Sequence, residues 1–430
     1  MEVEPMSSPI LPKPEFAAWI GIDWADQHHD VALHAAGSDR IEQKRIQATP
    51  EALSEWIAAL RGRFRGQSVG VCLEQSKGAL IHALLEHDFL VLYPINPSTL
   101  DQFRKAFATS GAKSDPSDAA LLLELLEKHG DRLHAWKPED PKTRALARFV
   151  EARRKAVDQR TRFIQRLNAE LKGYFPQALE WAGQDLSSAM ASDFLRRWPT
   201  LQAVQRARSE TLRRFYTTHH CRSVETIQRR IQQIRTAVPL LTDPAIVEPS
   251  AMTVQLLAEQ LRPLAKGIKA YDTRIQELFA EHPDSHLFDG LPGSGAVMAP
   301  RLLAAFGADR SRYPAAANLQ QYSGIAPVTE ASGKSRWVHR RWAAPKFVRQ
   351  TFHEFAGHSI RQSVWARAYY DQMRSRGKGH HAAVRALAFK WIRILWRCWQ
   401  DQIPYDEALY VEALRQRGSS LVQQLPALAA

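Results

Sequence analysis

The sequence predicts an α/β domain at the N-terminus followed by a longer, all-α part. Short apolar, β-favouring runs alternate with helical segments up to about residue 135, and two later stretches have apolar residues at intervals of three, four and seven. The charge divides along the same line, because the net charge is −7 over residues 1–141, +12 over 142–236 and +8 over 237–430. We therefore expect the two parts to differ in function, and the basic part to meet a polyanion.

The chain opens with a predicted disordered tail, residues 1–15. This stretch carries acidic residues and prolines where a targeting signal needs positive charge and an apolar run. The first strand is predicted at Ala18–Ile22 and ends at Asp23. Asp30–Ala35 alternates apolar and polar residues, so it can pair with the first strand as a hairpin.

The rest of the N-terminal domain, which is predicted to span residues 16–140, alternates helix and strand. The predicted helices cover Pro50–Leu60, Gly78–His87 and Asp115–Lys128. The predicted strands cover Ser68–Leu73, which ends at Glu74, and Phe89–Ile95. This alternation predicts a mixed sheet covered by helices.

Residues 141–282 are predicted to form long amphipathic helices. Apolar positions recur with helical spacing through Thr143–Phe175 and again through Val254–Phe279. We expect these helices either to pack as an antiparallel pair, in the manner of a coiled coil, or to join the subunits of an oligomer. Between them, residues 176–250 are helical in parts, with loops near Pro199 and over Pro239–Pro249, and the sequence assigns them no role.

Residues 283–402 are predicted to form a second, mostly helical domain, followed by a C-terminal tail over 403–430, of which the last 20 residues are expected to be weakly ordered. The domain opens with Leu291-Pro-Gly-Ser-Gly295 and runs through a loop-rich stretch to Trp342 before its last helices. The opening turn resembles a helix-hairpin-helix element, whose N–H groups, here at Gly293 and Gly295, can hold a phosphate. An ordinary helix entry explains the same turn equally well.

Four carboxylates stand at positions that favour metal binding. Asp23 and Glu74 directly follow predicted core strands, and Asp115 and Asp118 are three residues apart on one face of a helix start. Four acids that converge need a cation, and hard oxygen ligands suit Mg²⁺ or Mn²⁺. Structural interpretations stay open, because Asp115 and Asp118 also make a good helix cap, Asp23 suits a turn and Glu74 suits a solvated strand end.

A basic run near the C-terminus favours nucleic acid. Between residues 334 and 349 the chain has six basic residues and no acidic one: Lys334, Arg336, Arg340, Arg341, Lys346 and Arg349. Trp337, His339 and Trp342 lie among them and could stack on bases, although a solvated basic face would have the same pattern. Ser332 precedes the run; its hydroxyl could attack phosphorus, but Ser-Gly is also a common turn pair.

These motifs together resemble a known family. The start Ile20-Gly-Ile-Asp-Trp24, then Glu74, then the string Lys113-Ser-Asp-Pro-Ser-Asp-Ala119 resemble the RuvC-like domain of DEDD-type insertion-sequence transposases, insertion-sequence family 110. The string Tyr322-x-Gly-Ile-x-Pro, followed by Ser332-Gly-Lys334, is similar to the Transposase-20 domain that follows it in that family. The chain departs from the family at residues 341–345, Arg-Trp-Ala-Ala-Pro, where many members carry Ser-Lys-x-Gly.

The resemblance implies an RNase H-like N-terminal domain and a DNA recombinase. It implies that the metal-binding carboxylates are Asp23, Glu74, Asp115 and Asp118, and that Ser332 is a nucleophile that forms a covalent phosphoserine. Lys113 is then expected to contact nucleic acid. The resemblance further implies a structured bridge RNA that pairs with donor and target DNA, and a homo-oligomer in which one subunit's carboxylates meet another's Transposase-20 domain.

Two other classes of function stay open. A metal-dependent nuclease or Holliday-junction resolvase would use the carboxylates with water as its nucleophile. A non-catalytic nucleic-acid-binding protein would use only the basic part. The three cysteines are too far apart for a disulfide framework or a zinc site, which favours a cytoplasmic protein, and no apolar stretch is long enough to cross a membrane.

Overall fold

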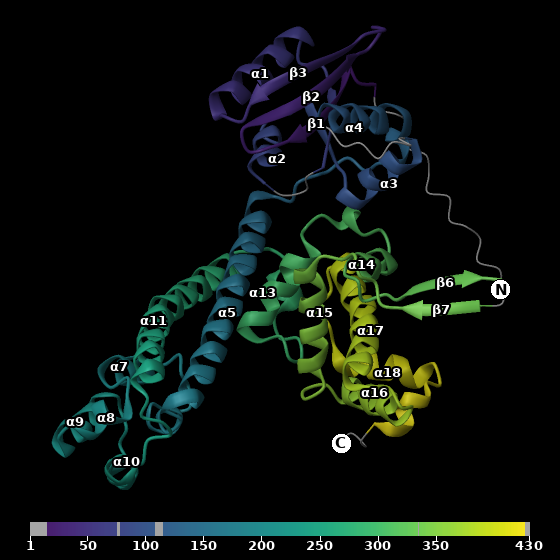
Figure 1. The fold of residues 1–430 in the computed structure, drawn as a ribbon. Coiled ribbons are helices and arrows are strands. Elements are labelled where there is room, and N and C mark those ends of the chain that lie inside the picture. The colour runs from purple at the N-terminus through teal and green to yellow at the C-terminus, as the bar shows by residue number, and fades with distance from the viewer. Residues whose placement is uncertain (1–14, 75–77, 108–114, 334, 426–430) are drawn as a thin grey trace. The chain divides into compact units, whose positions relative to one another are not determined.

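The computed structural model describes residues 15–74, 78–107, 115–333 and 335–425 (Figure 1). The chain divides into two compact units, residues 1–138 and 139–430. Most of the predicted N-terminal tail, residues 1–14, lies outside the described residues.

The N-terminal unit is built on a five-stranded mixed sheet, which confirms the predicted fold class. Its strands are β1 (Ala18–Trp24), β2 (His28–Ala35), β3 (Ile41–Gln47), β4 (Val69–Leu73) and β5 (Leu90–Pro94). Their order is β3-β2-β1-β4-β5. Strand β2 is antiparallel to both of its neighbours, β1 and β3, whereas β4 and β5 are parallel to β1. Strand β3 was not predicted, because this edge strand buries only Ile46 and lacks an apolar run.

Helices cover both faces of this sheet. On one face lie α1 (Pro50–Arg63) and α2 (Ala79–Leu84), whose apolar side chains share a core with alternate residues of the strands, such as Ile20 and Val71. On the other face lie α3 (Pro97–Phe107) and α4 (Asp115–His129), followed by the short η1 (Gly130–Arg132). Helix α3 was not predicted, although Asn96 caps its start by accepting a hydrogen bond from the Ser98 N–H at 3.0 Å.

The C-terminal unit contains a pair of long helices, α5 (Pro141–Tyr174) and α11 (Pro244–Ala280). They are antiparallel, because the start of α5 shares a core with the end of α11, and the end of α5 shares another core with the first half of α11. This confirms the antiparallel alternative. The loop predicted over Pro239–Pro249 is wrong from Pro244 onward, because α11 begins there with Asp243 as its N-cap. Pro249 and Pro263 both lie inside this helix.

Five short helices join α5 to α11 and form what we call the cap, residues 178–236. They are α6 (Ala178–Trp181), α7 (Ala189–Arg197), α8 (Leu201–Gln205), α9 (Ser209–Thr218) and α10 (Val224–Thr236). Aromatic residues, among them Trp181, Phe194 and Tyr216, fill the core that the cap shares with the long helices.

The remaining helices form a bundle around α17 (His380–Asp401). They are α12 (Ser285–Phe288), α13 (Gly295–Phe306), η2 (Arg310–Arg312), α14 (Ala316–Tyr322), α15 (Lys346–Ser359), α16 (Val364–Ser375), α18 (Glu407–Gln416) and η3 (Ser420–Gln424). The weak order predicted for the last 20 residues is wrong for Val411, Leu414 and Leu421, which are buried in the bundle core. Among the described residues, no helix is long and apolar enough to cross a membrane.

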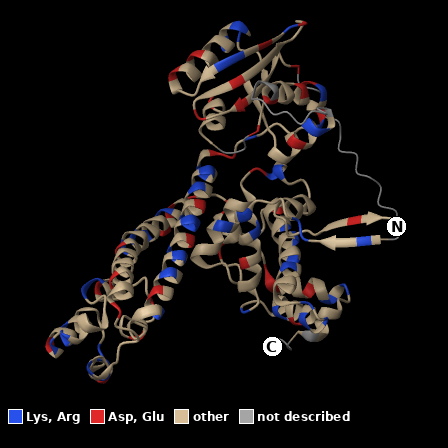
Figure 2. Ribbon diagram, viewed as in Figure 1, with Lys and Arg blue, Asp and Glu red and all other residues tan. Residues whose placement is uncertain are grey.

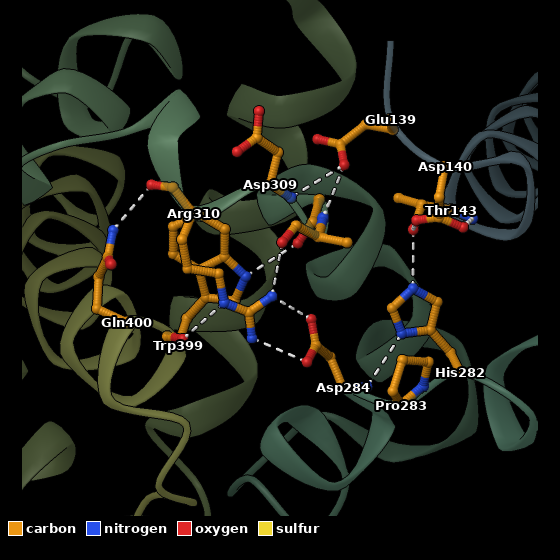
Figure 3. Close-up of polar contacts among 12 residues, drawn as sticks. Glu139, Asp140, Thr143, His282, Pro283, Asp284, Asp309, Arg310, Trp399 and Gln400 are labelled. Atoms are coloured by element: carbon orange, nitrogen blue, oxygen red, sulfur yellow. Dashed lines mark hydrogen bonds and ion pairs between the residues drawn. The ribbon is translucent and has the colours of Figure 1, made fainter. Parts of the chain in front are cut away.

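A polar network fastens α5 to this bundle (Figure 3). Glu139 accepts hydrogen bonds from the N–H groups of Ala308 and Asp309, at 2.9 and 3.1 Å. Thr143 Oγ1 lies 2.8 Å from the ring nitrogen Nε2 of His282, which is 3% exposed. His282 Nδ1 accepts from a backbone N–H, so the neutral imidazole donates from Nε2 to Thr143. The loop after α11 is thereby tied to the first turn of α5.

Residues 328–339 form a two-stranded antiparallel hairpin, β6 (Val328–Ser332) and β7 (Ser335–His339), where the sequence predicted a loop. Figure 1 shows it projecting from the helices of its unit. Its side chains are exposed from Thr329 to Val338, leaving out Lys334, which is not described. The hairpin was not predicted, because neither strand has a buried face and the sequence therefore lacks the apolar alternation of an ordinary strand.

Candidate active site

The first part of the candidate site is the carboxyl end of β1 and β4. These parallel strands are in register through the pair Ile22 and Leu73, and Asp23 and Glu74 are the next residue on each. Neighbouring parallel strands lie about 4.8 Å apart, so the two acids stand side by side at one edge of the sheet. Both residues are half-buried. The structure therefore brings together the two acids that the sequence placed at strand ends.

The same two acids share a face of the sheet with α4. Side chains alternate along a strand, so Asp23 lies on the face of Gly21, and Glu74 on the face of Cys72, which packs against α4. Helix α4 rests directly on β1 at Gly21. A Cβ there would stand 2.0 Å from the carbonyl oxygen of Ala119, so only glycine permits this approach. The glycine of the Ile-Gly-Ile-Asp motif thus sets the position of the helix that carries Asp118.

Asp118, in the first turn of α4, is buried in an ion pair with Arg104. Its side chain is 1% exposed, and Arg104 donates to Oδ1 from Nη2 at 2.7 Å and from Nε at 3.1 Å. The Arg104 side chain is itself only 15% exposed. A buried carboxylate needs such a partner, because transferring an unpaired charge out of water costs several kcal/mol. Both bonds go to Oδ1, so Oδ2 lies outside the ion pair.

Arg104 is the site residue that sequence reasoning missed. It belongs to α3, and without that helix nothing in the sequence links residue 104 to residue 118. The available signal was the helix start at Asn96-Pro97, from which Leu100, Phe103 and Arg104 fall on one face.

Not every predicted acid can be placed. Asp115 begins α4, but its side chain lies outside the described residues, as does the whole of Lys113. Within the part of the chain that the structure describes, no three or more His, Cys, Asp or Glu side chains gather closely enough to hold a metal ion. Asp23 and Glu74 are adjacent by register, whereas Asp118 is engaged by Arg104.

The second part of the candidate site is the β6–β7 hairpin with Ser332. Ser332 ends β6 and faces Ser335 across the turn, where Gly333 adopts a φ of +54°. Its side chain is exposed, and it lies on the same face of the hairpin as Trp337 and His339. Those two rings stack at 4.2 Å. Ser332 is thus the terminal residue of a strand, presented to solvent beside an aromatic surface.

His339 is tied to the neighbouring strand. Its Nε2 lies 2.8 Å from a carboxylate oxygen of Glu330, and this hydrogen bond raises the pKa of the imidazole. The raised pKa extends the pH range over which His339 is charged, and Glu330 is the only acid among the described residues of the hairpin.

The predicted basic contacts gather on this hairpin and at its base. Arg336 and Arg340 are exposed, and the guanidinium of Arg340 stacks on Trp342 at 5.1 Å. Lys346 begins α15 and is exposed, whereas Arg341 and Arg349 are half-buried. Burial and the charge of Arg340 lower the pKa of Arg349. Lys334 lies outside the described residues.

The turn before α13 has a structural explanation at Gly293. Its φ is +86°, and a Cβ would stand 2.8 Å from the backbone of His358 and Ser359. Its N–H donates to the side chain of Gln362 at 2.7 Å, so the donor that was predicted to hold a phosphate is already used within the protein. Gly295 is the first residue of α13 and has a φ of +51°; its phosphate contact stays a prediction.

Known proteins and protein families match most of the chain. A DEDD-type family described as transposase matches residues 20–176, and the transposase IS116/IS110/IS902 family matches residues 285–371. The chain is 28% identical to a mini-circle putative transposase for IS117 of Streptomyces coelicolor, over 90% of this chain and 95% of that protein. It is 27% identical to an uncharacterized 42 kDa protein of the insertion element IS900 of Mycobacterium paratuberculosis, over 91% and 97% of the two chains. It is 26% identical to an uncharacterized 44.8 kDa protein of IS116 of Streptomyces clavuligerus, over 89% and 95%.

Proposed function

The chain belongs to the IS110 family of transposases, enzymes that act on DNA, and from this premise we propose that it cuts and rejoins DNA with its carboxylates and the hydroxyl of Ser332. The observation that carries the proposal is the arrangement of Asp23, Glu74 and α4 on one face of the sheet. Sheet edges of this kind are where α/β proteins bind their ligands.

A divalent ion, Mg²⁺ or Mn²⁺, is part of the proposal, with Asp23, Glu74, Asp115 and Asp118 as its ligands. The donor set fits, because Asp23 and Glu74 are adjacent, half-buried carboxylates and Asp118 keeps Oδ2 outside its ion pair. Bound there, such an ion neutralises phosphate charge and stabilises a leaving oxygen. Asp118 would hold the ion through Oδ2, while Arg104 would keep its hydrogen bonds to Oδ1.

Ser332 is the proposed nucleophile. Its hydroxyl oxygen attacks the phosphorus of a phosphodiester, and the bond from phosphorus to the 3′ oxygen breaks. One proton leaves the serine and one joins the 3′ oxygen, so the products are a phosphoserine diester and a 3′ hydroxyl. The reverse attack by the 3′ hydroxyl of another strand rejoins the DNA and restores the serine. The exposed position of Ser332 at the end of β6 suits a substrate as large as duplex DNA.

A structured bridge RNA as guide and a homo-oligomer with shared active sites complete the proposal. Family membership supports both, and so does the charge of +12 over residues 142–236. Figure 2 shows Lys and Arg recurring along α5. Mass photometry of the purified protein, before and after RNase treatment, tests both: loss of bound RNA and a change of oligomer mass are expected.

The central experiment is a search for the covalent intermediate. Purified protein is incubated with its element-derived RNA, Mg²⁺ and DNA carrying the element ends, and any protein–DNA adduct is mapped by peptide mass spectrometry. An adduct on Ser332, lost in Ser332→Ala, supports the proposal. Ser335→Ala is the matched control, because Ser335 is equally exposed and directly opposite on the same face.

The carboxylates are tested separately. Asp23→Asn should abolish strand exchange, whereas Asp26→Asn, an exposed acid just after β1, should not. Cleavage that needs Asp23 but survives Ser332→Ala without an adduct would favour a metal-dependent nuclease with water as nucleophile. Binding without cleavage by any variant would favour a non-catalytic nucleic-acid-binding protein.

A further inference from the structure

The cap contains a cavity of about 410 Å³ between α7 and α9, in the part of the chain to which the sequence assigned no role. Its lining is basic and polar: Asp193, Arg196, Arg197, Arg214, Phe215, Thr218 and His219. We propose that this cavity binds the phosphate backbone of nucleic acid. This site extends the proposed function but does not depend on the chemistry of the carboxylates or of Ser332.

The only acid in the lining is already compensated. Arg262 donates to Asp193 at 3.2 Å, and Arg196 and His219 lie 3.7 and 3.5 Å from its carboxylate oxygens. Arg196 also pairs with Glu259 at 3.4 Å. Asp193 therefore serves to hold its neighbours in place and adds no free negative charge to the cavity.

Two arginines of the lining remain available to a ligand. Among the described residues, neither Arg197 nor Arg214 forms an ion pair, and both are exposed. The guanidinium of Arg197 stacks on the ring of Trp198 at 4.9 Å. Stacking fixes the plane of the guanidinium and leaves its N–H edge free, which is the edge that bonds a phosphate in a fork.

The wall behind these arginines is made of closely packed rings. Phe215 packs edge-on against Trp198 at 5.0 Å and lies 4.6 Å from the ring of His219. Because Phe215 and Trp198 are only 7% and 5% exposed, the cavity presents charge and hydrogen-bond donors but no aromatic face on which a base could stack. Such a site suits phosphate and sugar, without reading sequence, better than it suits a free nucleotide.

Composition supports the same ligand. Residues 176–250 contain ten arginines and no lysine. Surface solubility alone would be served by lysine as well as by arginine, whereas bidentate bonding to phosphate is specific to the planar guanidinium.

The test compares two double variants of the full-length protein with equal loss of charge. Arg197→Gln with Arg214→Gln removes the free arginines of the cavity, and Arg222→Gln with Arg229→Gln removes two exposed arginines elsewhere on the cap. Affinity for a duplex DNA of arbitrary sequence and for a hairpin RNA is measured over a salt series. Ser332→Ala is present in every protein and Mg²⁺ is omitted, so the result is independent of cleavage.

The cavity variant should lose about tenfold or more in affinity, and the slope of log affinity against log salt should fall by about one to two. A loss for one probe only identifies that nucleic acid as the ligand. Thr218→Asp, which adds a negative charge without removing an arginine, should weaken binding in the same way. Equal losses in both double variants, or no loss in the cavity variant for either probe, would overturn the proposal.

Discussion

The contact between Gly21 and α4 allows a quantitative prediction for Gly21→Ala. The added Cβ would stand 2.0 Å from the carbonyl oxygen of Ala119 and 2.5 Å from the amide nitrogen of Leu123. Both are backbone atoms of a helix, so no side-chain rotation can relieve the clash. The helix as a whole must move away from β1 until the closer contact reaches about 3.4 Å, where ordinary van der Waals contact begins.

A shift of that size disturbs the packing of α4 along its length. Overpacking a well-filled core typically costs about 1–3 kcal/mol, and we expect the upper end here because both partners are backbone. For a domain of this size, about 3 kcal/mol lowers the melting temperature by roughly 10 °C. The same movement carries Asp118 away from Asp23 and Glu74, so strand exchange should fall further than the loss of folded protein explains.

The assay is thermal unfolding by circular dichroism, together with strand exchange at a temperature where the variant is still folded. Gly62→Ala is the control, because Gly62 lies in α1 and a Cβ there would meet nothing within 4 Å. Replacing this helical glycine should leave the melting temperature unchanged or raise it slightly. If Gly21→Ala melted like the wild type and kept full activity, the glycine would not position α4.

Three further outcomes follow from contacts described above. Arg104→Ala leaves the buried Asp118 unpaired and should destabilise the N-terminal unit by about 3–5 kcal/mol in urea unfolding, with Asp118→Asn partly restoring stability in the double variant. Burial lowers the pKa of His282 from 6.5 in the folded state. The stability that the neutral, buried imidazole contributes is therefore present above pH 6.5 and is lost as the pH falls through the lower pKa of the folded state. The free energy of unfolding of His282→Gln should depend less on pH below 6.5 than that of the wild type. Trp337→Ala, at a side chain that is 58% exposed, should leave the melting temperature within about 2 °C but weaken DNA binding in a filter assay.

Each of these outcomes can fail in a recognisable way. An Arg104→Ala protein as stable as the wild type would show that solvent compensates Asp118. An unchanged pH profile in His282→Gln would place the acid sensitivity elsewhere. Full DNA binding by Trp337→Ala would remove the hairpin's aromatic face from the interface.

The sequence predicted the parts of the fold that bury a continuous face. The strands at Asp23 and Glu74 were found because core strands are apolar on both sides, and α5 was found because its helical spacing runs unbroken for more than thirty residues. The edge strand β3 and the β6–β7 hairpin were not predicted, because strands that bury few side chains have no apolar pattern in their sequence.

The site was predictable where local signals coincided, and not where it depended on packing. A strand that ends in an acid predicts a position at a sheet edge, so the pairing of Asp23 with Glu74 could be anticipated. The ion pair of Asp118 with Arg104 could not, because it joins two helices across a segment whose path the sequence does not define. At Gly293 the local motif predicted a phosphate contact, but in the structure its N–H donates a hydrogen bond to the side chain of Gln362.

The exposure of the β6–β7 hairpin also has a consequence for how the protein diversifies. Its described side chains from Thr329 to Val338 contribute nothing to a core, so substitutions among them leave the bundle's folding unchanged. Substitutions at these positions are therefore expected to change binding and chemistry alone. Apart from Ser332, the hairpin can therefore take up other contacts through changes in its own side chains, without any change in the helices beneath it.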